Sequence, residues 1–394
     1  MKVLILGGSG IQGSASANDL LTMEPLAEVV LVDKDRETLE SRSAWLDSNR
    51  VSIKQIDVTD RDRLARFITE EDFDVVISSV PWPISIPPLE AAIDAGVHFI
   101  DYGLYQNREF DERLSEFHER AKKAQVTVIP SCGVAPGLTN MLAAYGASKL
   151  DQVGNVSIYV GGIPEKPQPP LEYKAVWSID GVWTQFFEGC RIIRDGKLTV
   201  VDAGSEREEL EFSEIGQLEA ACTDGLGTLL HMYKDPLFKG VKEVVEKTIR
   251  YPGHYDKIMV LKACGLLDTT PVEIDGTMIP PRRFLTKLLT PYLTLEESDR
   301  DMTLMRVRVS GSANGDETTC TFDMIDYRDL ERGVLSMGRT TGYTGSILAS
   351  LLHKGKITDR GVVEPERLGA NQDLFPEILQ EYARRNINIS ARTD

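Results

Sequence analysis

The sequence is poor in the residues that build disulfide frameworks and metal sites. Its 394 residues include only five cysteines, scattered along the chain without a C-x-x-C pair, and five histidines. An odd number of dispersed cysteines argues against a disulfide framework, and neither residue type shows metal-ligand spacing. We therefore expect no bound metal and a reducing, cytoplasmic location.

Positive charge and long apolar runs are also scarce. The chain carries 44 Lys and Arg against 61 Asp and Glu, a formal net charge of −17. This balance repels nucleic acid and anionic membranes, although it accepts a small cationic substrate. The N-terminus enters a strand-like segment directly, without a basic region, a long apolar span or a cleavage site. We therefore expect no signal peptide and no membrane anchor.

The chain does have enough length and apolar content for two or three domains, with 42% hydrophobic residues. Its first third alternates short apolar strands with helical patterns, which is typical of a parallel sheet with crossover helices. The expected strands cover residues 3–6, 28–33, 51–57, 74–80, 97–101 and 126–130.

From about residue 150 the pattern changes to longer strands with polar alternation and hairpin turns. Asp195-Gly196 and Asn314-Gly315 each stand at the centre of such a hairpin. Beyond residue 340 we expect two amphipathic helices that pack back on the first domain. The fold class is therefore α/β, a Rossmann-type doubly wound parallel sheet followed by an α+β domain whose sheet is mixed and largely antiparallel. The expected domains are 1–133, 134–340 and, for the C-terminal helical segment, 341–394.

A glycine-rich loop follows the first expected strand. Residues 7–13 read Gly-Gly-Ser-Gly-Ile-Gln-Gly, which is G-x-G-x-x-G from Gly8 or G-x-x-G-x-x-G from Gly7, and a helical pattern comes next. Glycines permit a tight turn and let backbone N–H groups reach a pyrophosphate at the helix N-terminus. The alternative is a glycine turn without a ligand.

Asp33 closes the next strand, where a carboxylate binds ribose hydroxyls and repels a 2′-phosphate. We therefore predict NAD rather than NADP, although Arg36 in the same loop is able to accept a phosphate. Other candidates follow the third and fourth strands, where a dinucleotide crosses the sheet or where the chain simply turns. The predicted cofactor-binding residues are Gly8, Gly10, Ile11, Gln12, Gly13, Asp33, Asp57, Val58, Ser79, Val80 and Pro81.

Five further stretches carry a resemblance to a known family. They are GVAPGLTNML (133–142), YVGGIPEKPQPPLEYKAVWS (159–178), TDGLGTLL (223–230), TIRYPGH (248–254) and TTGYTGSI (340–347). With the glycine loop, they make the chain resemble the saccharopine dehydrogenase-like family, and within it most of all the NAD-dependent lysine 6-dehydrogenases. The resemblance implies a Rossmann domain, a central substrate domain whose sheet also forms a dimer interface, and a C-terminal helical segment that returns to the Rossmann domain.

The stretch SCGVAPGLTN is predicted to join the first two domains. Gly133 and Gly137 supply unusual backbone angles, and Thr139 or Asn140 caps the helix that follows. Cys132 is not expected to act as a nucleophile, because hydride transfer needs no covalent intermediate. It is either a small buried residue or a wall of the substrate pocket.

Oxidation of an amine by NAD requires a group that takes a proton and later activates water. Asp101 and Tyr102 end the fifth expected strand, and His254 follows the short turn that begins at Arg250. These three, His254, Asp101 and Tyr102, are the predicted catalytic residues. Each has a plain alternative, since a residue at such a place often only caps the next helix.

Arg250 suits a substrate carboxylate, because its planar fork matches two oxygens, although a solvated charge or a salt bridge would explain it equally well. Lys174 and Trp177 belong to an expected strand, YKAVWS, one face of which would line a pocket. Saccharopine reductases resemble this chain here but carry an arginine where Asp180 stands, which disfavours a ligand with several carboxylates. Asp224 is either a substrate contact or a helix cap. The predicted substrate-binding residues are Arg250, Lys174, Trp177, Asp180, Asp224 and Cys132.

The leading hypothesis is NAD-dependent oxidative deamination of the ε-amino group of L-lysine to allysine, which closes to 1-piperideine-6-carboxylate. Within the same family the alternative is a saccharopine- or opine-type dehydrogenase, and from a different class a non-catalytic NAD-binding sensor. The expected partners are a small amino-acid substrate and a second copy of the chain, with no nucleic acid and no membrane.

Overall fold

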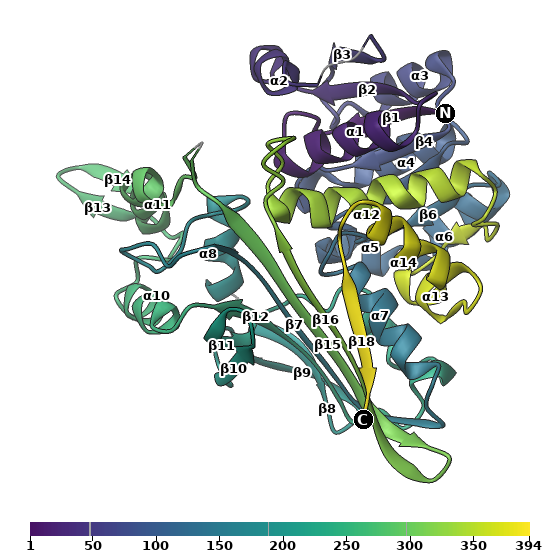
Figure 1. Cartoon of the computed structure of the whole chain (residues 1–394). Coiled ribbons are helices and arrows are strands. Elements are labelled where there is room, and N and C mark those ends of the chain that lie inside the picture. The colour runs from purple at the N-terminus through teal and green to yellow at the C-terminus, as the bar shows by residue number, and fades with distance from the viewer. Residues whose placement is uncertain (47–48, 188, 297) are drawn as a thin grey trace. The chain divides into compact units, whose positions relative to one another are not determined.

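The computed structural model describes residues 1–46, 49–187, 189–296 and 298–394, and it divides into two compact units (Figure 1). The first unit consists of Met1–Lys149, Gly227–Met232 and Gly338–Asn388, and the second of Leu150–Leu226, Tyr233–Met337 and Ile389–Asp394. Each unit is therefore assembled from separate chain segments. The contiguous boundaries expected from the sequence remain a prediction, because compactness does not test which segments fold alone.

The first unit is built on a parallel sheet with the strand order β17-β6-β5-β4-β1-β2-β3. Its inner strands are buried on both faces, as their continuous apolar runs require. The six expected strands are confirmed, and β17 is an addition too short to show a sequence pattern. The strands are β1 (Lys2–Leu6), β2 (Glu28–Asp33), β3 (Val51–Gln55), β4 (Val75–Ser78), β5 (His98–Asp101), β6 (Thr127–Ile129) and β17 (Gly361–Val362).

Helices connect the strands of this sheet, and further helices follow β17 along the chain. The two amphipathic helices expected near the C-terminus are confirmed as α12 and α14, and α12 enters the first unit at Gly338. The helices are α1 (Ile11–Met23), α2 (Arg36–Ser43), α3 (Arg61–Glu71), η1 (Trp82–Ile84), α4 (Ile86–Asp94), η2 (Leu104–Gln106), α5 (Arg108–Glu112), α6 (Leu114–Lys123), α7 (Leu138–Ala147), α9 (Leu229–Met232), α12 (Ser336–His353), α13 (Pro365–Ala370) and α14 (Leu374–Arg384).

The stretch 131–140 lies inside the first compact unit, which runs on to Lys149. Ser131 (φ +49°) and Gly137 (φ +129°) hold positive backbone angles, whereas Gly133 does not, contrary to the prediction. The Oδ1 atom of Asn140 accepts the N–H of Gly137 at 3.1 Å, so Asn140 stabilises the start of α7. The chain passes into the second unit only after this helix.

The second unit contains the predicted mixed, largely antiparallel sheet. Its path is β10-β11-β12-β7-β15-β16-β18, with β8 and β9 attached beside β12. The neighbours β7 and β12 are parallel, and the other pairs are antiparallel. The strands are β7 (Gln152–Pro164), β8 (Gly189–Arg194), β9 (Lys197–Asp202), β10 (Glu208–Phe212), β11 (Gly216–Cys222), β12 (Glu243–Arg250), β15 (Asp301–Ala313), β16 (Asp316–Tyr327) and β18 (Ile389–Thr393).

Both predicted hairpin turns are confirmed. Asp195 and Gly196 connect β8 to β9 with φ of +50° and +70°, and Asn314 and Gly315 connect β15 to β16 with φ of +55° and +90°. Positive φ at both central residues is what a two-residue type I′ turn requires.

The expected strand YKAVWS is wrong, because residues 173–178 form an irregular loop with one isolated bridge, from Ala175 to Thr294. Tyr173 and Val176 are both fully buried.

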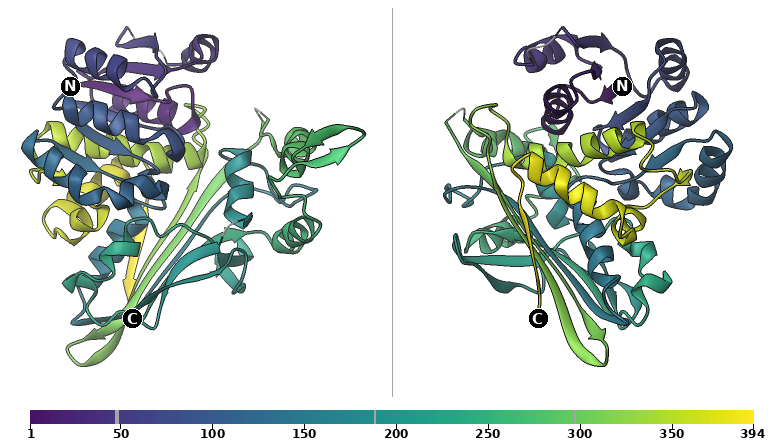
Figure 2. Two further views of the ribbon diagram at one scale, coloured as in Figure 1. Left: turned by 180° about the vertical axis from the view of Figure 1, so that it is seen from behind. Right: turned by 45° about the vertical axis from the view of Figure 1, so that its right-hand side comes forward.

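Helices and a small hairpin lie at one end of the second unit's sheet, away from the turn that joins β15 to β16 (Figure 2). Among the described residues, no helix of either unit has the length and apolar character needed to cross a bilayer. The elements at this end are α8 (Ile179–Phe187), α10 (His254–Ala263), β13 (Val272–Ile274), β14 (Thr277–Ile279) and α11 (Pro281–Leu293), whereas η3 (Pro236–Phe238) lies near the start of β7.

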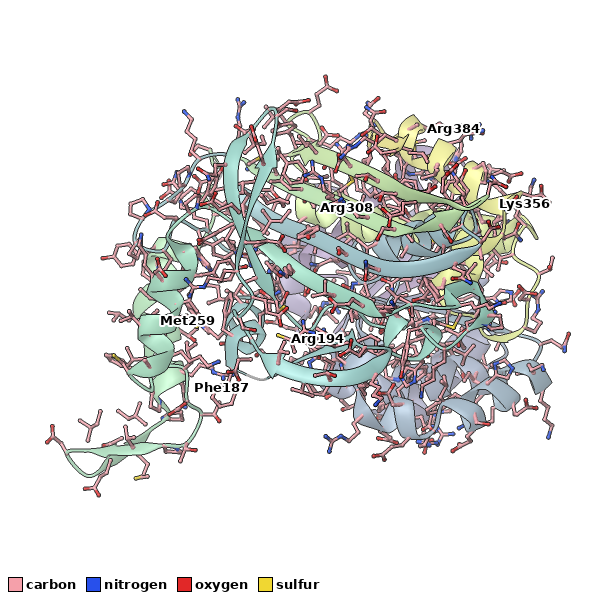
Figure 3. The ribbon with its side chains drawn as sticks, turned by 90° about the horizontal axis from the view of Figure 1, so that it is seen from below. Phe187, Arg194, Met259, Arg308, Lys356 and Arg384 are labelled. Carbon is pink, nitrogen blue, oxygen red and sulfur yellow. The ribbon has the colours of Figure 1, made fainter. Side chains whose placement is uncertain are left out.

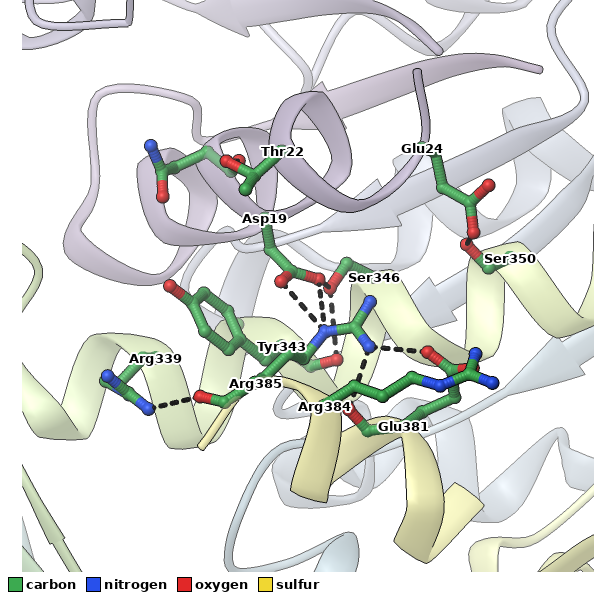
Figure 4. Close-up of polar contacts among 12 residues, drawn as sticks. Asp19, Thr22, Glu24, Arg339, Tyr343, Ser346, Ser350, Glu381, Arg384 and Arg385 are labelled. Carbon is green, nitrogen blue, oxygen red and sulfur yellow. Dashed lines mark hydrogen bonds and ion pairs between the residues drawn. The ribbon is translucent and has the colours of Figure 1, made fainter. Parts of the chain in front are cut away.

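A buried ion pair holds the C-terminal helices of the first unit against its first helix (Figure 4). The Nε atom of Arg385 donates to both oxygens of Asp19, at 2.8 and 2.9 Å, and the two side chains are 1% and 3% exposed. The Ser346 hydroxyl of α12 donates to the same carboxylate, and Arg385 also binds Glu381 at 2.7 Å. One carboxylate on α1 therefore fixes both α12 and the end of α14.

We predict that Asp19→Ala destabilises the protein by about 3 kcal/mol, because the Arg385 guanidinium loses its buried counter-charge and keeps only Glu381, which is more exposed than Asp19. Urea unfolding followed by circular dichroism measures the change. Arg36→Ala, which removes the exposed Arg36–Glu40 pair, is the matched control and should cost less than about 1 kcal/mol. Equal costs for the two variants would contradict the assignment.

Candidate functional site

The glycine loop between β1 and α1 has no room for side chains. Gly7 has a φ of +75°, and a Cβ added to Gly13 would stand 2.5 Å from the carbonyl oxygen of Gly7. A Cβ added to Gly8 would stand 2.8 Å from the Cβ of Leu31. Among the described residues no side chain caps α1 at Gly10, so the N–H groups of its first turn remain available. This cradle fits the pyrophosphate of a dinucleotide.

Asp33 stands beside this loop at the end of β2. Its Oδ2 accepts hydrogen bonds from the hydroxyl and, at 3.4 Å, the N–H of Ser9, and its Oδ1 accepts the N–H of Lys34 at 2.8 Å. The carboxylate is therefore held where ribose hydroxyls are bound in this fold. Arg36, which the sequence offers as a phosphate ligand, pairs with Glu40 at 2.7 Å on the exposed face of α2.

The chain after β4 reaches the same loop. A Cβ on Gly7 would stand 2.7 Å from the carbonyl oxygen of Ser79, so the two backbones are in contact. Val80 is half-buried and Pro81 exposed. The structure thus brings the predicted residues of this turn to the glycine cradle.

The turn after β3 contains the last two predicted cofactor residues. Asp57 is exposed, and its carboxylate accepts the N–H and the hydroxyl of Thr59 at 3.0 and 2.7 Å, which lowers its pKa. Val58 is buried in the core. Asp57 therefore shapes its own turn, as the plain alternative predicts, while remaining accessible to a ligand.

Asp101 and Cys132 lie together in the interior of the first unit. Asp101 is fully buried, its Oδ1 accepts the N–H of Gly103 at 2.6 Å, and burial raises its pKa to about 6. Its backbone carbonyl accepts the N–H of Cys132 at 2.6 Å. Burial raises the pKa of the Cys132 thiol well above its usual value. These surroundings favour the structural alternative for Cys132.

Tyr102 points into a contact between two helices. Its hydroxyl lies 2.7 Å from the Oγ of Ser16 in α1 and donates to the carbonyl of Gly342 in α12 at 3.1 Å. Burial raises its pKa, so the phenol keeps its proton. Of the predicted catalytic residues, Tyr102 is thus the one whose polar group is fully used in holding helices together.

In the second unit, the turn after β12 brings Arg250 and His254 into one buried cluster. Gly253 has a φ of +88° and begins α10, so that His254 is its first residue. The guanidinium carbon of Arg250 lies 4.6 Å from the ring centroid of Tyr173, whose ring lies 5.5 Å from that of His254. All three side chains are buried. The structure therefore joins two predicted residues and adds Tyr173, which the sequence did not single out.

Arg250 is buried without an ion-pair partner among the described residues. Its Nη1 donates to the carbonyl of Ile249 at 2.8 Å and its Nη2 to Oε1 of Gln185 at 3.3 Å, whereas Nε has no partner among the described residues. No carboxylate of those residues lies within ion-pair distance of it. A buried guanidinium in this state is costly, and a bound carboxylate would satisfy it. This residue is the best carboxylate anchor in the cluster.

His254 offers a second unpaired atom. Its Nδ1 lies 2.7 Å from the carbonyl of Leu171 and so carries the ring proton, and Nε2 has no partner among the described residues. Burial, assisted by the positive charge of Arg250, lowers the pKa of His254 to about 3. The imidazole is therefore neutral at physiological pH, so its Nε2 is able to accept a hydrogen bond from a ligand without taking up a proton.

A buried carboxyl group stands on the same face of β12 as Arg250. Glu246, Thr248 and Arg250 alternate along the strand, so their side chains leave it in one direction. Thr223 donates to Oε2 of Glu246 at 2.5 Å, and Thr248 to Oε1 at 3.4 Å. Burial raises the pKa of Glu246 to about 8, and no cation of the described residues lies within ion-pair distance. A bound ammonium group would favour its ionised form.

Two predicted substrate contacts are engaged elsewhere. Lys174 forms an ion pair with Asp299 at 2.5 Å, and Asp224 is bound by the guanidinium of Arg191, with a shortest distance of 2.8 Å. Each therefore has a structural partner, and neither plain alternative describes it, because Lys174 is buried and Asp224 binds Arg191.

The remaining two predicted contacts flank α8. Asp180 is exposed in the first turn of α8, where the helix dipole favours a negative charge, and it accepts the hydroxyl of Thr286 at 3.3 Å. Trp177 is half-buried and packs against the hydrophobic cluster that contains Tyr173, whose pKa is raised by burial. Trp177 thus belongs to the same cluster as Tyr173, whereas Asp180 stabilises the first turn of α8.

Sequence reasoning missed Tyr173, Gln185 and Glu246. Tyr173 was assigned to a strand that does not form, and Gln185 reaches Arg250 across 65 residues of chain. Glu246 carried a usable signal, because an acid, a hydroxyl and a base occupy alternate positions of one strand, Glu246, Thr248 and Arg250. Polar residues on the inward face of a strand need partners, which marks that face as a candidate site.

Two family models match this chain, one over its N-terminal part and the other over most of the remainder. Residues 3–129 match a family model described as "Saccharopine dehydrogenase NADP binding domain", and residues 133–387 match "Saccharopine dehydrogenase C-terminal domain". Carboxynorspermidine synthase of Vibrio cholerae is 22% identical over 96% of this chain and 94% of its own. Saccharopine dehydrogenase [NADP(+), L-glutamate-forming] of Saccharomyces cerevisiae is 22% identical over 97% of both chains.

A solved structure confirms the fold. The apo form of saccharopine dehydrogenase (L-Glu forming) from Saccharomyces cerevisiae matches with a TM-score of 0.79 at 20% identity, covering 100% of this chain and 99% of its own. The predicted fold class, a Rossmann-type parallel sheet with a second mixed-sheet domain, is therefore confirmed.

We predict that Glu246→Gln changes how stability depends on pH. The folded pKa of about 8 lies above the ordinary value of 4.5, so the folded protein binds an extra proton between these values and the free energy of unfolding falls as pH rises through that window. The variant lacks this proton, so its advantage over the native protein should grow from pH 5 to 9 in urea unfolding. Glu211→Gln, at an exposed position, should run parallel to the native curve. A parallel curve for Glu246→Gln as well would contradict the assignment.

Proposed function

The chain belongs to the saccharopine dehydrogenase family, and on that premise we propose that it is an NAD-dependent amine dehydrogenase that oxidises the ε-amino group of L-lysine. The product is allysine, which closes to 1-piperideine-6-carboxylate. The observation that carries the proposal is the buried pair of unmatched groups on β12, the guanidinium of Arg250 and the carboxyl of Glu246. Together they suit a compact amino acid with one carboxylate and a cationic end.

For the cofactor we propose NAD. A bound nicotinamide dinucleotide would supply the hydride acceptor. Gly7, Gly8 and Gly13 would hold its pyrophosphate, and Asp33 its ribose hydroxyls. The matching family model is described as NADP-binding, and NADP remains the alternative. Against it, the Asp33 carboxylate would repel a 2′-phosphate, and the nearby Arg36 is paired with Glu40.

Arg250 and Tyr173 would receive the α-carboxylate of lysine. The unused Nε of Arg250 and its Nη2, held only by a 3.3 Å bond to Gln185, together form the fork that binds two carboxylate oxygens. The ring of Tyr173 beneath the guanidinium keeps it in place.

We propose a role for His254 that differs from the proton transfer predicted from the sequence. With a pKa of about 3 it is too weak a base to take a proton from an ammonium group, so we propose that its Nε2 accepts a hydrogen bond from the substrate. Glu246 is the better matched proton acceptor, since its pKa of about 8 lies nearer that of the lysine amine. Turnover should accordingly rise with pH, as both the carboxylate and the neutral amine become more abundant.

A saccharopine-type reaction is the second candidate, because relatives with that printed activity match this chain over nearly its whole length. Against it stands Asp180, which is exposed at the position where saccharopine reductases carry an arginine, so this position offers no cation to a second carboxylate. The repulsion of one carboxylate at about 4 Å from an exposed group is worth about 1 kcal/mol.

We predict that the native protein prefers NAD and that Asp33→Ala loses most of that preference. The carboxylate binds the ribose hydroxyls of NAD and repels the 2′-phosphate of NADP, so removing it raises KM for NAD and lowers KM for NADP. Initial rates with the two cofactors give the ratio of kcat/KM. Asp35→Ala, which removes the exposed cap of α2, is the control and should leave the ratio unchanged. A native preference for NADP would contradict the assignment of Asp33.

We predict that lysine is turned over far better than saccharopine and that Arg250→Met raises KM for lysine by roughly 10- to 100-fold, the value of a charge-assisted hydrogen bond. KM for NAD should stay the same. The reduced cofactor formed with a panel of amines measures both points, and Arg308→Met, at an exposed position of β15 (Figure 3), is the control. Efficient use of saccharopine with none of lysine would replace this proposal by the second candidate, and no turnover of any amine would favour a cofactor-binding sensor.

A further inference from the structure

Two threonine hydroxyls stand beside the buried carboxyl of Glu246. The last antiparallel pair of β11 and β12 is Cys222 with Lys247. Thr223, the next residue, therefore stands opposite Glu246, and its backbone N–H donates to the carbonyl of Glu246 at 3.3 Å. Residues that are opposite one another in such a pair point to the same face of the sheet. Thr248, two residues beyond Glu246 on β12, points to that face as well.

The contacts among these three side chains close a ring. Oγ1 of Thr223 lies 2.5 Å from Oε2 of Glu246 and 2.6 Å from Oγ1 of Thr248. Oγ1 of Thr248 completes the ring, 3.4 Å from Oε1 of Glu246. The three residues are between 2% and 4% exposed. A Cβ added to Gly225 would stand 2.7 Å from Cδ and Oε2 of Glu246, so the carboxyl is tightly enclosed by the backbone as well.

The ring has a place for every hydrogen in both ionisation states of Glu246. Each threonine hydroxyl supplies one hydrogen, and a protonated carboxyl supplies a third. In the ionised state Thr223 donates to Oε2, and Thr248 donates to Thr223 or to Oε1. In the protonated state the carboxyl donates to Thr223, Thr223 to Thr248, and Thr248 to Oε1. Glu246 is therefore able to gain or lose a proton while its heavy atoms stay in place.

The hydroxyls also oppose the effect of burial on Glu246. Burial raises the pKa of the carboxyl to about 8, and the hydrogen bond from Thr223 is the largest influence that lowers it. Burial also raises the pKa of the nearby thiols and phenol, so these groups stay neutral where Glu246 titrates. The titratable and charged groups that face Glu246 are Asp224, which is paired with Arg191, and Arg250, Cys190, Cys222 and Tyr255.

We propose that Thr223, supported by Thr248, is a positioning residue that holds the carboxyl of Glu246 ready to accept the substrate's proton. The catalytic part of this inference rests on the proposed function, in which Glu246 takes a proton from the ε-ammonium group of lysine. In that step an N–H bond of the ammonium breaks, an O–H bond forms on the carboxyl, and the neutral amine keeps the electron pair. The neutral acid then donates to Thr223, so it stays in the ring.

The ionisation constant of Glu246 tests the ring without any substrate. In protein labelled with ¹³C at the glutamate carboxyl carbons, the NMR signal that is missing from Glu246→Gln identifies this residue. Thr223→Val should lower the ionisation constant at least about 10-fold, because the carboxylate loses a charge-assisted hydrogen bond. Thr223→Ser keeps the hydroxyl and should restore the native value. Thr248→Val should have a smaller effect, since its contact with the carboxyl is the longest in the ring.

The pH profile of turnover tests the catalytic part. With lysine as substrate, the rising limb of kcat/KM for Thr223→Val should move to higher pH by about one unit, because a higher pH is needed to ionise Glu246. KM for NAD should stay the same. Thr321→Val, at an equally buried threonine of β16, is the matched control and should change neither the ionisation constant nor the profile.

An unchanged ionisation constant in Thr223→Val would overturn the inference, as would a Thr223→Ser protein that titrates like Thr223→Val or a control that shifts as far. If Thr223→Val does not fold, as judged by circular dichroism, an unchanged constant in Thr248→Val overturns it instead. A protein that oxidises lysine with the same profile in both Thr223 variants would overturn the catalytic part alone. Absence of turnover with lysine would overturn the proposed function, whereas the titration decides the ring by itself.

Discussion

Burying a charge costs several kcal/mol unless a counter-charge is buried with it, and the two units meet this constraint in opposite ways. In the first unit the guanidinium of Arg385 and the carboxylate of Asp19 are both almost fully buried and satisfy one another. The result is rigid and complete. In the second unit Arg250 and Glu246 are equally buried, but neither forms an ion pair with a described residue, and the charge of Arg250 lowers the pKa of Glu246 only against the larger, opposite effect of burial. A buried guanidinium without an ion-pair partner is tolerated where a ligand supplies one, which is why we propose a site at these two residues and regard the first two as a scaffold.

What the sequence predicts well is what a short stretch determines by itself. The six strands of the parallel sheet are continuous apolar runs, the glycine loop follows directly from its residues, and the turns at Asp195-Gly196 and Asn314-Gly315 need only the backbone freedom of those pairs. The candidate site was predicted in part. Arg250 and His254 lie in one turn, so their proximity is local and could be anticipated.

The rest of the site depends on contacts between residues far apart in the chain. Lys174 was predicted to bind the substrate because its ion-pair partner, Asp299, lies 125 residues away and the local sequence pattern does not reveal it. Asp224 is the same case, with Arg191 as its partner. Nor does composition indicate that aromatic rings enclose the imidazole of His254. That enclosure lowers the pKa of His254 to about 3 and turns the expected base into a neutral acceptor.

The discontinuous make-up of the first unit bears on how the protein is synthesised. The ribosome releases Met1–Lys149 first, yet the carboxylate of Asp19, on the first helix of that segment, is neutralised only when Arg385 follows, 366 residues later. Until then the nascent nucleotide-binding sheet lacks β17 and the helices that cover α1. The second unit leaves the ribosome in between and remains one strand short until β18 arrives. Vectorial folding therefore cannot complete the first unit before Arg385 or the second before β18 has been added, and a stop codon upstream of Arg385 would remove closing elements of both.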